Sequence, residues 1–337
     1  MNSLIVILCM MVLISCKKTE VPEQGYFNPI PIDTVKITPV TLEKYDYLAT
    51  NADELISALD KAKPGEVVFI DKNAQIDLSN SNTISLRRGV KLYSSRGVDE
   101  SLGGLVYSNN PNKTMFSIIG DNVRISGVRI QGPHGSTTNI NPDYYVGIQV
   151  TAELALIDNC EIFGWPYAAV KFRNTHSGHI SACYLHHNQN NGLGYGVVLE
   201  RGYALIDYNY FDYNRHAIAG DGRAGTSYDA AYNTILSHGT AHSFDMHGSE
   251  GDNQGIGGTA ININNNTFYM RNFKAITIRA TPEKELIIKD NRFVHPNEQS
   301  AISILSSGNF GSEMISDNTF NIPPKEIIIQ LHTEVNN

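Results

Sequence analysis

Ionisable side chains recur at one position in a series of short apolar segments in the second half of the chain. Each segment holds an apolar residue that we expect to point inward; these are Ile148, Val170, Val197, Ile218, Phe244, Ile276 and Ile302. Because side chains alternate between the two faces of a strand, the third residue after each points outward. Those residues are Thr151, Arg173, Glu200, Asp221, His247, Arg279 and Leu305. Five successive strands therefore predict a stripe of ionisable groups on one outer face.

Further titratable residues flank the same strands, close to Asp221 and His247. They are Arg215, His216, Arg223, Tyr228, His238, His242, Asp245 and Arg271. The small residues Ala219, Gly220 and Gly222 leave room for a ligand beside Asp221. Outward strand faces are commonly polar, but titratable groups gathered around small residues favour a functional site.

One chemistry that suits this stripe is β-elimination on a uronate-containing polysaccharide. The reaction needs a cation that neutralises the uronate carboxylate, a base for the C5 proton and an acid for the leaving oxygen. Arg279 or Arg223 could neutralise the carboxylate. His247, or an arginine or lysine with a lowered pKa, could be the base. Tyr228 or His242 could donate the proton. Several arginines near the stripe suit an anionic substrate.

Calcium is a second candidate for neutralising the substrate. It prefers several oxygen ligands, which Glu200, Asp221 and Asp245 could supply. A zinc site is disfavoured, because the histidines around Asp245 do not follow a zinc-binding spacing on a strand.

The residues expected to bind substrate are Arg173, Glu200, His216, His238 and Arg271.

Two alternatives to a lyase remain open. Asp221 and Asp245 lie one coil apart and two residues offset, which gives about 8 Å between their backbones and permits an inverting glycoside hydrolase. The stripe could instead be a non-catalytic sugar-binding or adhesive surface. Aromatic residues for stacking on sugar rings are present in Tyr107, Tyr144, Tyr145 and Trp165.

The overall charge bears on the class of partner. The 337 residues carry 26 Lys and Arg against 34 Asp and Glu, a formal net charge of −8. A nucleic-acid-binding protein usually has a basic excess, so no nucleic-acid partner is expected. We expect a monomer. The Gly- and Asn-rich segments 186–196 and 248–258 lie near the stripe and could wall a cleft.

The elements that position the stripe come from an internal repeat with the form Ile-x-x-Asn-x-Phe. It recurs about every 20–30 residues, and each copy is followed by one of the apolar segments above. Short strands at such a period predict a parallel solenoid with inward asparagines bonded from coil to coil. Cys160 and Cys183 fall at the asparagine position, so we interpret them as buried substitutes.

Residues 51–70 predict a short capping helix, started by Asn51 or Asp53 and ended by Pro64-Gly65, and then a strand. This helix and strand at the start of the domain, together with ISLRRGVKLYSSRG (84–97) and GDNVRISGVRIQGP (120–133), resemble the pectin-lyase-like superfamily. The resemblance covers roughly residues 48–325. The resemblance implies an all-β fold, a single-stranded right-handed parallel β-helix. Its members include polysaccharide lyases, glycoside hydrolases, epimerases and non-catalytic adhesins, so it does not decide the activity.

The N-terminus indicates export. The apolar run 3–15 ends in Leu13-Ile14-Ser15-Cys16, which resembles a bacterial lipobox. We therefore expect a signal peptide at 1–15, lipid on Cys16, a proline-containing tether at 16–45 and the β-helix at 46–337. Residues 325–332 predict a last strand that covers the open end. The sequence favours a lyase anchored in the cell envelope, at the outer membrane, with the hydrolase and the binding protein as alternatives.

Overall fold

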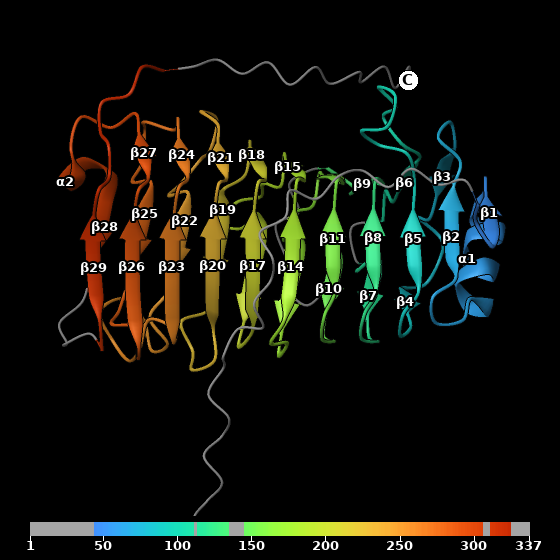
Figure 1. Ribbon diagram of the computed structural model, residues 1–337, viewed down its shortest axis with the longest axis horizontal. Coiled ribbons are helices and arrows are strands. Elements are labelled where there is room, and N and C mark those ends of the chain that lie inside the picture. The colour runs from blue at the N-terminus through green and yellow to red at the C-terminus, as the bar shows by residue number, and fades with distance from the viewer. Residues whose placement is uncertain (1–43, 111–112, 135–144, 306–310, 325–337) are drawn as a thin grey trace, which may run out of the picture. The chain divides into compact units, whose positions relative to one another are not determined.

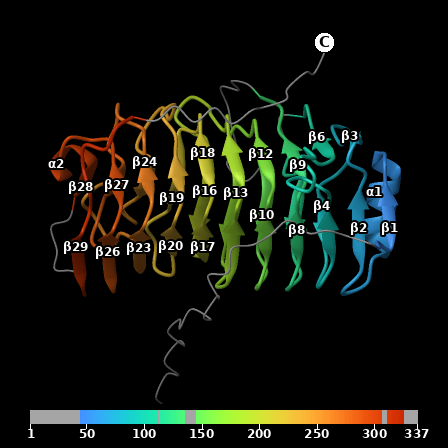
Figure 2. The same ribbon diagram turned by 45° about the horizontal axis from the view of Figure 1, so that its top comes forward.

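The computed structural model describes residues 44–110, 113–134, 145–305 and 311–324. Within these residues the chain winds repeatedly through three parallel sheets, which we call A, B and C (Figure 1). Nearly every strand pairs with the corresponding strand of the coils before and after it, so the sheets run side by side along the solenoid (Figure 2). The predicted all-β parallel solenoid is confirmed. No helix in the described ranges is long and apolar enough to cross a membrane.

Sheet A has eleven strands: β1 (Tyr47–Ala49), β2 (Val67–Ile70), β5 (Lys91–Tyr93), β8 (Arg124–Ser126), β11 (Leu156–Asp158), β14 (Gly178–Ser181), β17 (Tyr203–Asp207), β20 (Ser227–Ala231), β23 (Ala260–Asn264), β26 (Glu285–Lys289) and β29 (Glu313–Ser316). Sheet B has nine: β3 (Gln75–Asp77), β6 (Leu105–Tyr107), β9 (Arg129–Gln131), β12 (Glu161–Phe163), β15 (Tyr184–His186), β18 (Tyr210–Asp212), β21 (Thr234–Ile235), β24 (Thr267–Phe268) and β27 (Arg292–Phe293). Sheet C has nine: β4 (Ile84–Leu86), β7 (Phe116–Ile118), β10 (Val146–Val150), β13 (Ala168–Arg173), β16 (Tyr195–Glu200), β19 (His216–Gly220), β22 (Phe244–Met246), β25 (Ile276–Ile278) and β28 (Ile302–Ile304).

The repeat Ile-x-x-Asn-x-Phe forms two strands, one in sheet A and one in sheet B. The chain bends between them at a residue with positive φ, such as Tyr208 (54°) or Asn265 (55°). The next residue is the buried asparagine. For example, the Nδ2 group of Asn266 donates to the carbonyl of Ala230 and to the Oδ1 atom of Asn291. This ladder satisfies backbone groups that the bend leaves without strand partners.

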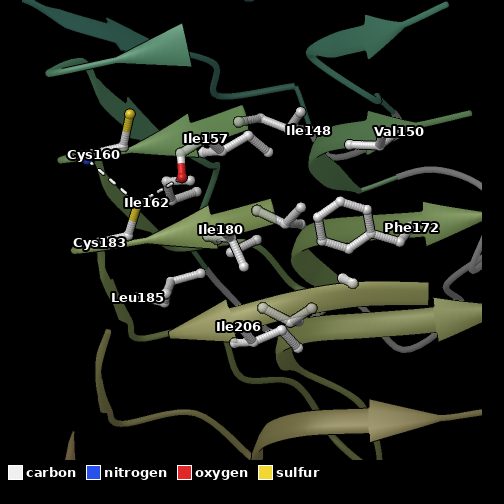
Figure 3. Packing of buried hydrophobic residues seen from close by; sticks show 14 of the residues in the cluster. Ile148, Val150, Ile157, Cys160, Ile162, Phe172, Ile180, Cys183, Leu185 and Ile206 are labelled. Carbon is white, nitrogen blue, oxygen red and sulfur yellow. Dashed lines mark hydrogen bonds between the residues drawn. The ribbon is translucent and has the colours of Figure 1, made fainter. Parts of the chain in front are cut away.

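Cys160 and Cys183 continue the asparagine ladder, as predicted, and both are buried free thiols. The backbone N–H of Cys160 donates to the Sγ atom of Cys183 at 3.4 Å (Figure 3). Isoleucine, leucine and valine from the three sheets fill the interior beside them (Figure 3). Each coil leaves its outer face available for polar side chains.

Helix α1 (Ala52–Lys61) packs beside β1 and β2 near the start of the solenoid (Figure 1). Asn51 is its N-cap, because its side chain accepts a hydrogen bond from the backbone N–H of Glu54. Leu55, Ala58 and Leu59 are buried. The short helix α2 (Glu298–Ala301) lies beside β28 in the last coils.

Several sequence predictions lie outside the described residues. They are the signal peptide, Cys16, nearly all of the tether, Tyr144 and the strand at 325–332.

Candidate active site

The predicted ionisable stripe lies on the outer face of sheet C. Arg173 and Glu200 are register partners on β13 and β16. One column nearer the strand start, Ala219, Asp245 and Thr277 are partners on β19, β22 and β25. The side-chain alternation inferred from the sequence therefore predicted the register of these strands.

A groove of about 230 Å³ lies on this face. Its lining residues are Tyr167, Tyr195, Val198, Glu200, Ala219, Gly220, Asp221, His247 and Gly248. Val198 and Ala219 are buried members of an apolar cluster that also contains both tyrosines. The groove thus combines an apolar, partly aromatic surface with carboxylates and a histidine. Ala219 and Gly220 line it, as predicted.

Asp245 is the centre of the polar network beside the groove. It is fully buried, and Arg279 donates to both of its oxygens, Nε to Oδ1 at 2.7 Å and Nη2 to Oδ2 at 2.9 Å. His247 Nε2 lies 3.3 Å from Oδ2. Burial alone would raise the pKa of Asp245, but the hydrogen bonds from His247 and Arg279 and the nearby histidines hold it well below its usual range. Asp245 is therefore an anion that positions its neighbours.

His216 approaches the same oxygen of Asp245 as His247, with Nε2 3.4 Å from Oδ2. Burial lowers its pKa to about 4, so the ring is neutral at neutral pH. Its Nδ1 lies 2.6 Å from the carbonyl oxygen of His242, and its Nε2 lies 2.5 Å from Arg215 Nη1. These two contacts fit the tautomer in which Nδ1–H donates and Nε2 accepts. Arg215 has no ion pair with a carboxylate within the described residues.

Asp221 presents at the groove one oxygen that accepts no hydrogen bond from a described residue. Its Oδ1 accepts hydrogen bonds from the hydroxyl of Thr226 and from the backbone N–H of Arg223. Its Oδ2 is buried and makes no hydrogen bond with any described residue, and Arg223 Nη1 is 3.9 Å away. A buried acceptor without a donor is costly, so this oxygen suits a ligand hydroxyl.

Glu200 is held by residues of the preceding coil. Lys171 Nζ lies 2.8 Å from its Oε1, and the hydroxyl of Tyr167 donates to the same atom at 3.1 Å. Arg173 lies 3.6 Å from Oε2. The Lys171 ammonium, on a side chain only 1 % exposed, also lies over the Tyr167 ring. Glu200 therefore lines the groove as a carboxylate that is already ion-paired.

The donor set proposed for calcium does not fit that ion. Cationic side chains already occupy Glu200 and Asp245, through Lys171 and Arg279. Across the described ranges, no group of three or more His, Cys, Asp or Glu side chains is arranged to hold a metal.

Two predicted roles are wrong because of the surroundings of Tyr228 and Gly222. Tyr228 belongs to sheet A and is fully buried in the interior, packed edge-on against Phe244. It cannot protonate a leaving group on the outer face of sheet C. Gly222 does not make room for a ligand, since a Cβ there would lie 2.0 Å from the carbonyl oxygen of His247.

Three other predicted residues have different surroundings from those expected. His238 follows sheet B, where it contacts Asp212 at 3.0 Å and stacks on Tyr213. Arg271 is exposed on the segment after β24 and does not line the groove. His242 is near the network, with its ring 6.0 Å from that of His216, and burial lowers its pKa.

Sequence reasoning missed the wall of the groove. Tyr167 and Tyr195 lie two or three residues before the inward valines of β13 and β16, at the start of each strand. The available signal was an aromatic residue at this offset, with Tyr145 before β10 as a third case.

Comparison with known proteins supports the fold. Residues 146–329 match the family model described as the right-handed β-helix region. The crystal structure of an alginate lyase from Paenibacillus sp. strain FPU-7 is similar, with a TM-score of 0.51 and 16% identity over 81% of this chain and 94% of that one. The Dettilon tailspike protein gives a TM-score of 0.48 and 14% identity over 80% of this chain and 57% of that one. A search of curated protein sequences returned no match.

Proposed function

The chain belongs to the right-handed β-helix family, and we propose that it binds an acidic polysaccharide in the groove of sheet C and cleaves it by β-elimination. The observation that carries this proposal is the histidine at the groove. His247 is anchored by a buried anion, and its side chain is 42% exposed. The alginate lyase noted above has the same fold at low identity, which supports the choice of substrate class only by analogy.

His247 is the proposed base. In the tautomer in which Nε2–H donates to Asp245, the lone pair on Nδ1 is available to take the C5 proton. Asp245 then stabilises the imidazolium that forms. The C4–O bond breaks as the C4–C5 double bond forms, and no water is added to the product.

Tyr195 is the proposed acid and Arg215 the proposed neutralising cation. Burial raises the pKa of Tyr195, although nearby Arg215 opposes this, so the hydroxyl remains protonated and can donate to the leaving oxygen. Arg215 is a cation beside Tyr195 that no described carboxylate neutralises. It is therefore better suited to neutralise the carboxylate of the reacting uronate than Arg279, whose charge the buried Asp245 already balances.

Hydrolysis by Asp221 and Asp245 is less well supported than elimination. An inverting hydrolase needs one carboxylic acid and one free carboxylate. Asp245 forms an ion pair with Arg279 and is not one of the residues that line the groove. We assign Asp221 to binding a sugar hydroxyl through Oδ2, which accepts no hydrogen bond from the residues that the structure describes.

The cellular location is proposed from the sequence alone. The apolar run that ends at Cys16 favours a protein exported, acylated and tethered to the outer membrane, where extracellular polysaccharide is accessible. Labelling of cells with a radioactive fatty acid would test this, since Cys16→Ala should abolish incorporation.

Product masses test the activity. The purified full-length protein is incubated with acidic and neutral polysaccharides, and the fragments are analysed by mass spectrometry. Fragments with an unsaturated uronate end and no added water support the lyase. Fragments heavier by one water would show that the protein is a hydrolase. Binding without cleavage of any polysaccharide in the panel would favour a carbohydrate-binding protein.

A further inference from the structure

Arg279 binds two carboxylates, one on each side of its guanidinium group. On the inner side, Nε and Nη2 donate to Asp245, which is fully buried. On the outer side, Nη1 lies 3.2 Å from both oxygens of Asp252, whose side chain is 54% exposed. The inner pair is short and shielded from water, whereas the outer pair is longer and solvated. The outer carboxylate is therefore the one that can exchange.

Asp252 lies in segment 248–258, which starts at the groove with Gly248 and returns to the solenoid near Thr281. The segment is folded on itself, with Ser249 N–H donating to the Ile256 carbonyl. Near Asp252 it contacts the sheet through the Asn253 N–H, which donates to the carbonyl of Arg279 at 2.6 Å. Its residues 250–255 are exposed. A turn attached at so few points can move without disturbing the strands.

We propose that Asp252 is a built-in carboxylate that occupies Arg279 until a carboxylate of the bound polymer replaces it. Asp245 holds the guanidinium in place, so the exchange changes only the partner of Nη1. His247 and Arg279 follow Asp245 and Thr277, which are register partners, by two residues, so Arg279 lies one coil beyond the base. A neutral sugar cannot replace an anion on arginine, and Asp252 therefore makes this position selective for acidic units.

The inference rests on the proposed function only in taking the polymer to carry carboxylates. Calorimetric titration with tetrasaccharides from alginate and from polygalacturonate, and with neutral cellotetraose, measures binding for the native protein and for Asp252→Asn. Removing the competitor should tighten binding of an acidic tetrasaccharide about two- to fivefold, the size of an exposed ion pair. Affinity for cellotetraose should not change.

Two control variants separate this effect from a general change of charge. Asp252→Glu keeps the carboxylate and should retain native affinity. Asp60→Asn removes another exposed carboxylate that is paired with an arginine, Arg87, and should also have no effect. In the native protein, acidic ligand should speed hydrogen exchange at the Asn253 amide.

Equal affinities of the native protein and Asp252→Asn, or no binding of acidic tetrasaccharide by either, would overturn the inference. Binding is measured here and cleavage is not. If the protein binds acidic polymer but does not cleave it, the proposed lyase activity is wrong. The proposal that Asp252 is displaced from Arg279 would still hold.

Discussion

His247 Nε2 lies 3.3 Å from Asp245 Oδ2, so a half-exposed imidazole at the groove is joined to a carboxylate that is fully buried. The two residues are separated only by Met246, which points into the core from β22. The alternation of side chains along one strand is thus enough to place an anion and the imidazole that it contacts on the same outer face.

Replacement of His247 by Gln should abolish most of the cleavage and leave the fold intact. A positioned general base contributes about 10²–10⁴-fold to the rate, and the exposed ring contributes little to packing. The initial rate of unsaturated product and the thermal midpoint are measured together. His176→Gln, at an exposed histidine on the turn after β13, is the control. A parallel loss of thermal stability would mean that His247 is structural.

Replacement of Asp245 by Ala should destabilise the protein, because Arg279 is then left partly buried without its main partner. Removing one member of a buried ion pair costs about 3–5 kcal/mol of unfolding free energy. Denaturant titration measures the change, and Asp60→Asn, at an exposed pair, should cost less than about 1 kcal/mol. Similar costs for the two variants would show that the Asp245 pair is solvated.

A larger side chain on the floor of the groove should block the ligand. Ala219 is 2% exposed and lines the groove, so Ala219→Leu would fill it from below. Ala231→Leu is the matched control, at a buried alanine (8% exposed) on sheet A. The Kd for acidic tetrasaccharide should rise at least tenfold for Ala219→Leu only. Unchanged binding would place the ligand outside this groove.

Much of the fold was predictable because each coil repeats the same local rule. The Ile-x-x-Asn-x-Phe unit marks the buried positions, and alternation then places Glu200, Asp221 and His247 on one outer stripe. The division of that unit between two sheets was not predicted. It depends on a bend with positive φ, at residues such as Ala182 and Tyr208 that do not favour this conformation by themselves.

The site was predicted less well, because the direction of each side chain and the partner of each charged group depend on tertiary contacts. The sequence predicts Tyr228 as a proton donor on the surface, yet its side chain is buried in the core. The sequence predicts Asp245 as a catalytic carboxylate, yet Arg279, which lies 34 residues further along the chain, donates to both of its oxygens. The sequence alone does not show that Asp245 pairs with Arg279 or that Tyr228 packs against Phe244, because the loops between coils differ in length.

The pH dependence of stability should carry a contribution from His216. Its folded-state pKa is about 4, below the value of about 6.5 expected in the unfolded chain. As the pH falls below about 6.5, the unfolded state takes up a proton that the native ring does not. Stability is therefore lost between pH 6.5 and 4, by about 3 kcal/mol, and the loss levels off below pH 4. His216→Gln should remove this part of the slope in denaturant titrations, and His176→Gln should not. Parallel curves for His216→Gln and the native protein would contradict the assignment.

The asparagine ladder should stabilise the coils in its middle more than at its end. Asn266 Oδ1 accepts both from the backbone N–H and from the Nδ2 group of Asn233, and all three groups are buried. Asn266→Ala leaves these two donors without an acceptor, which should cost about 2–4 kcal/mol.

Asn318 makes the same two contacts with Asn291, but it lies in the last described coil and is partly exposed. Water can replace its side chain there, so Asn318→Ala should cost about 1 kcal/mol. Denaturant titration of the two variants compares identical chemistry at two depths. A cost that is equal at both positions would mean that the ladder acts through the conformation of the bend, because burial would then make no difference.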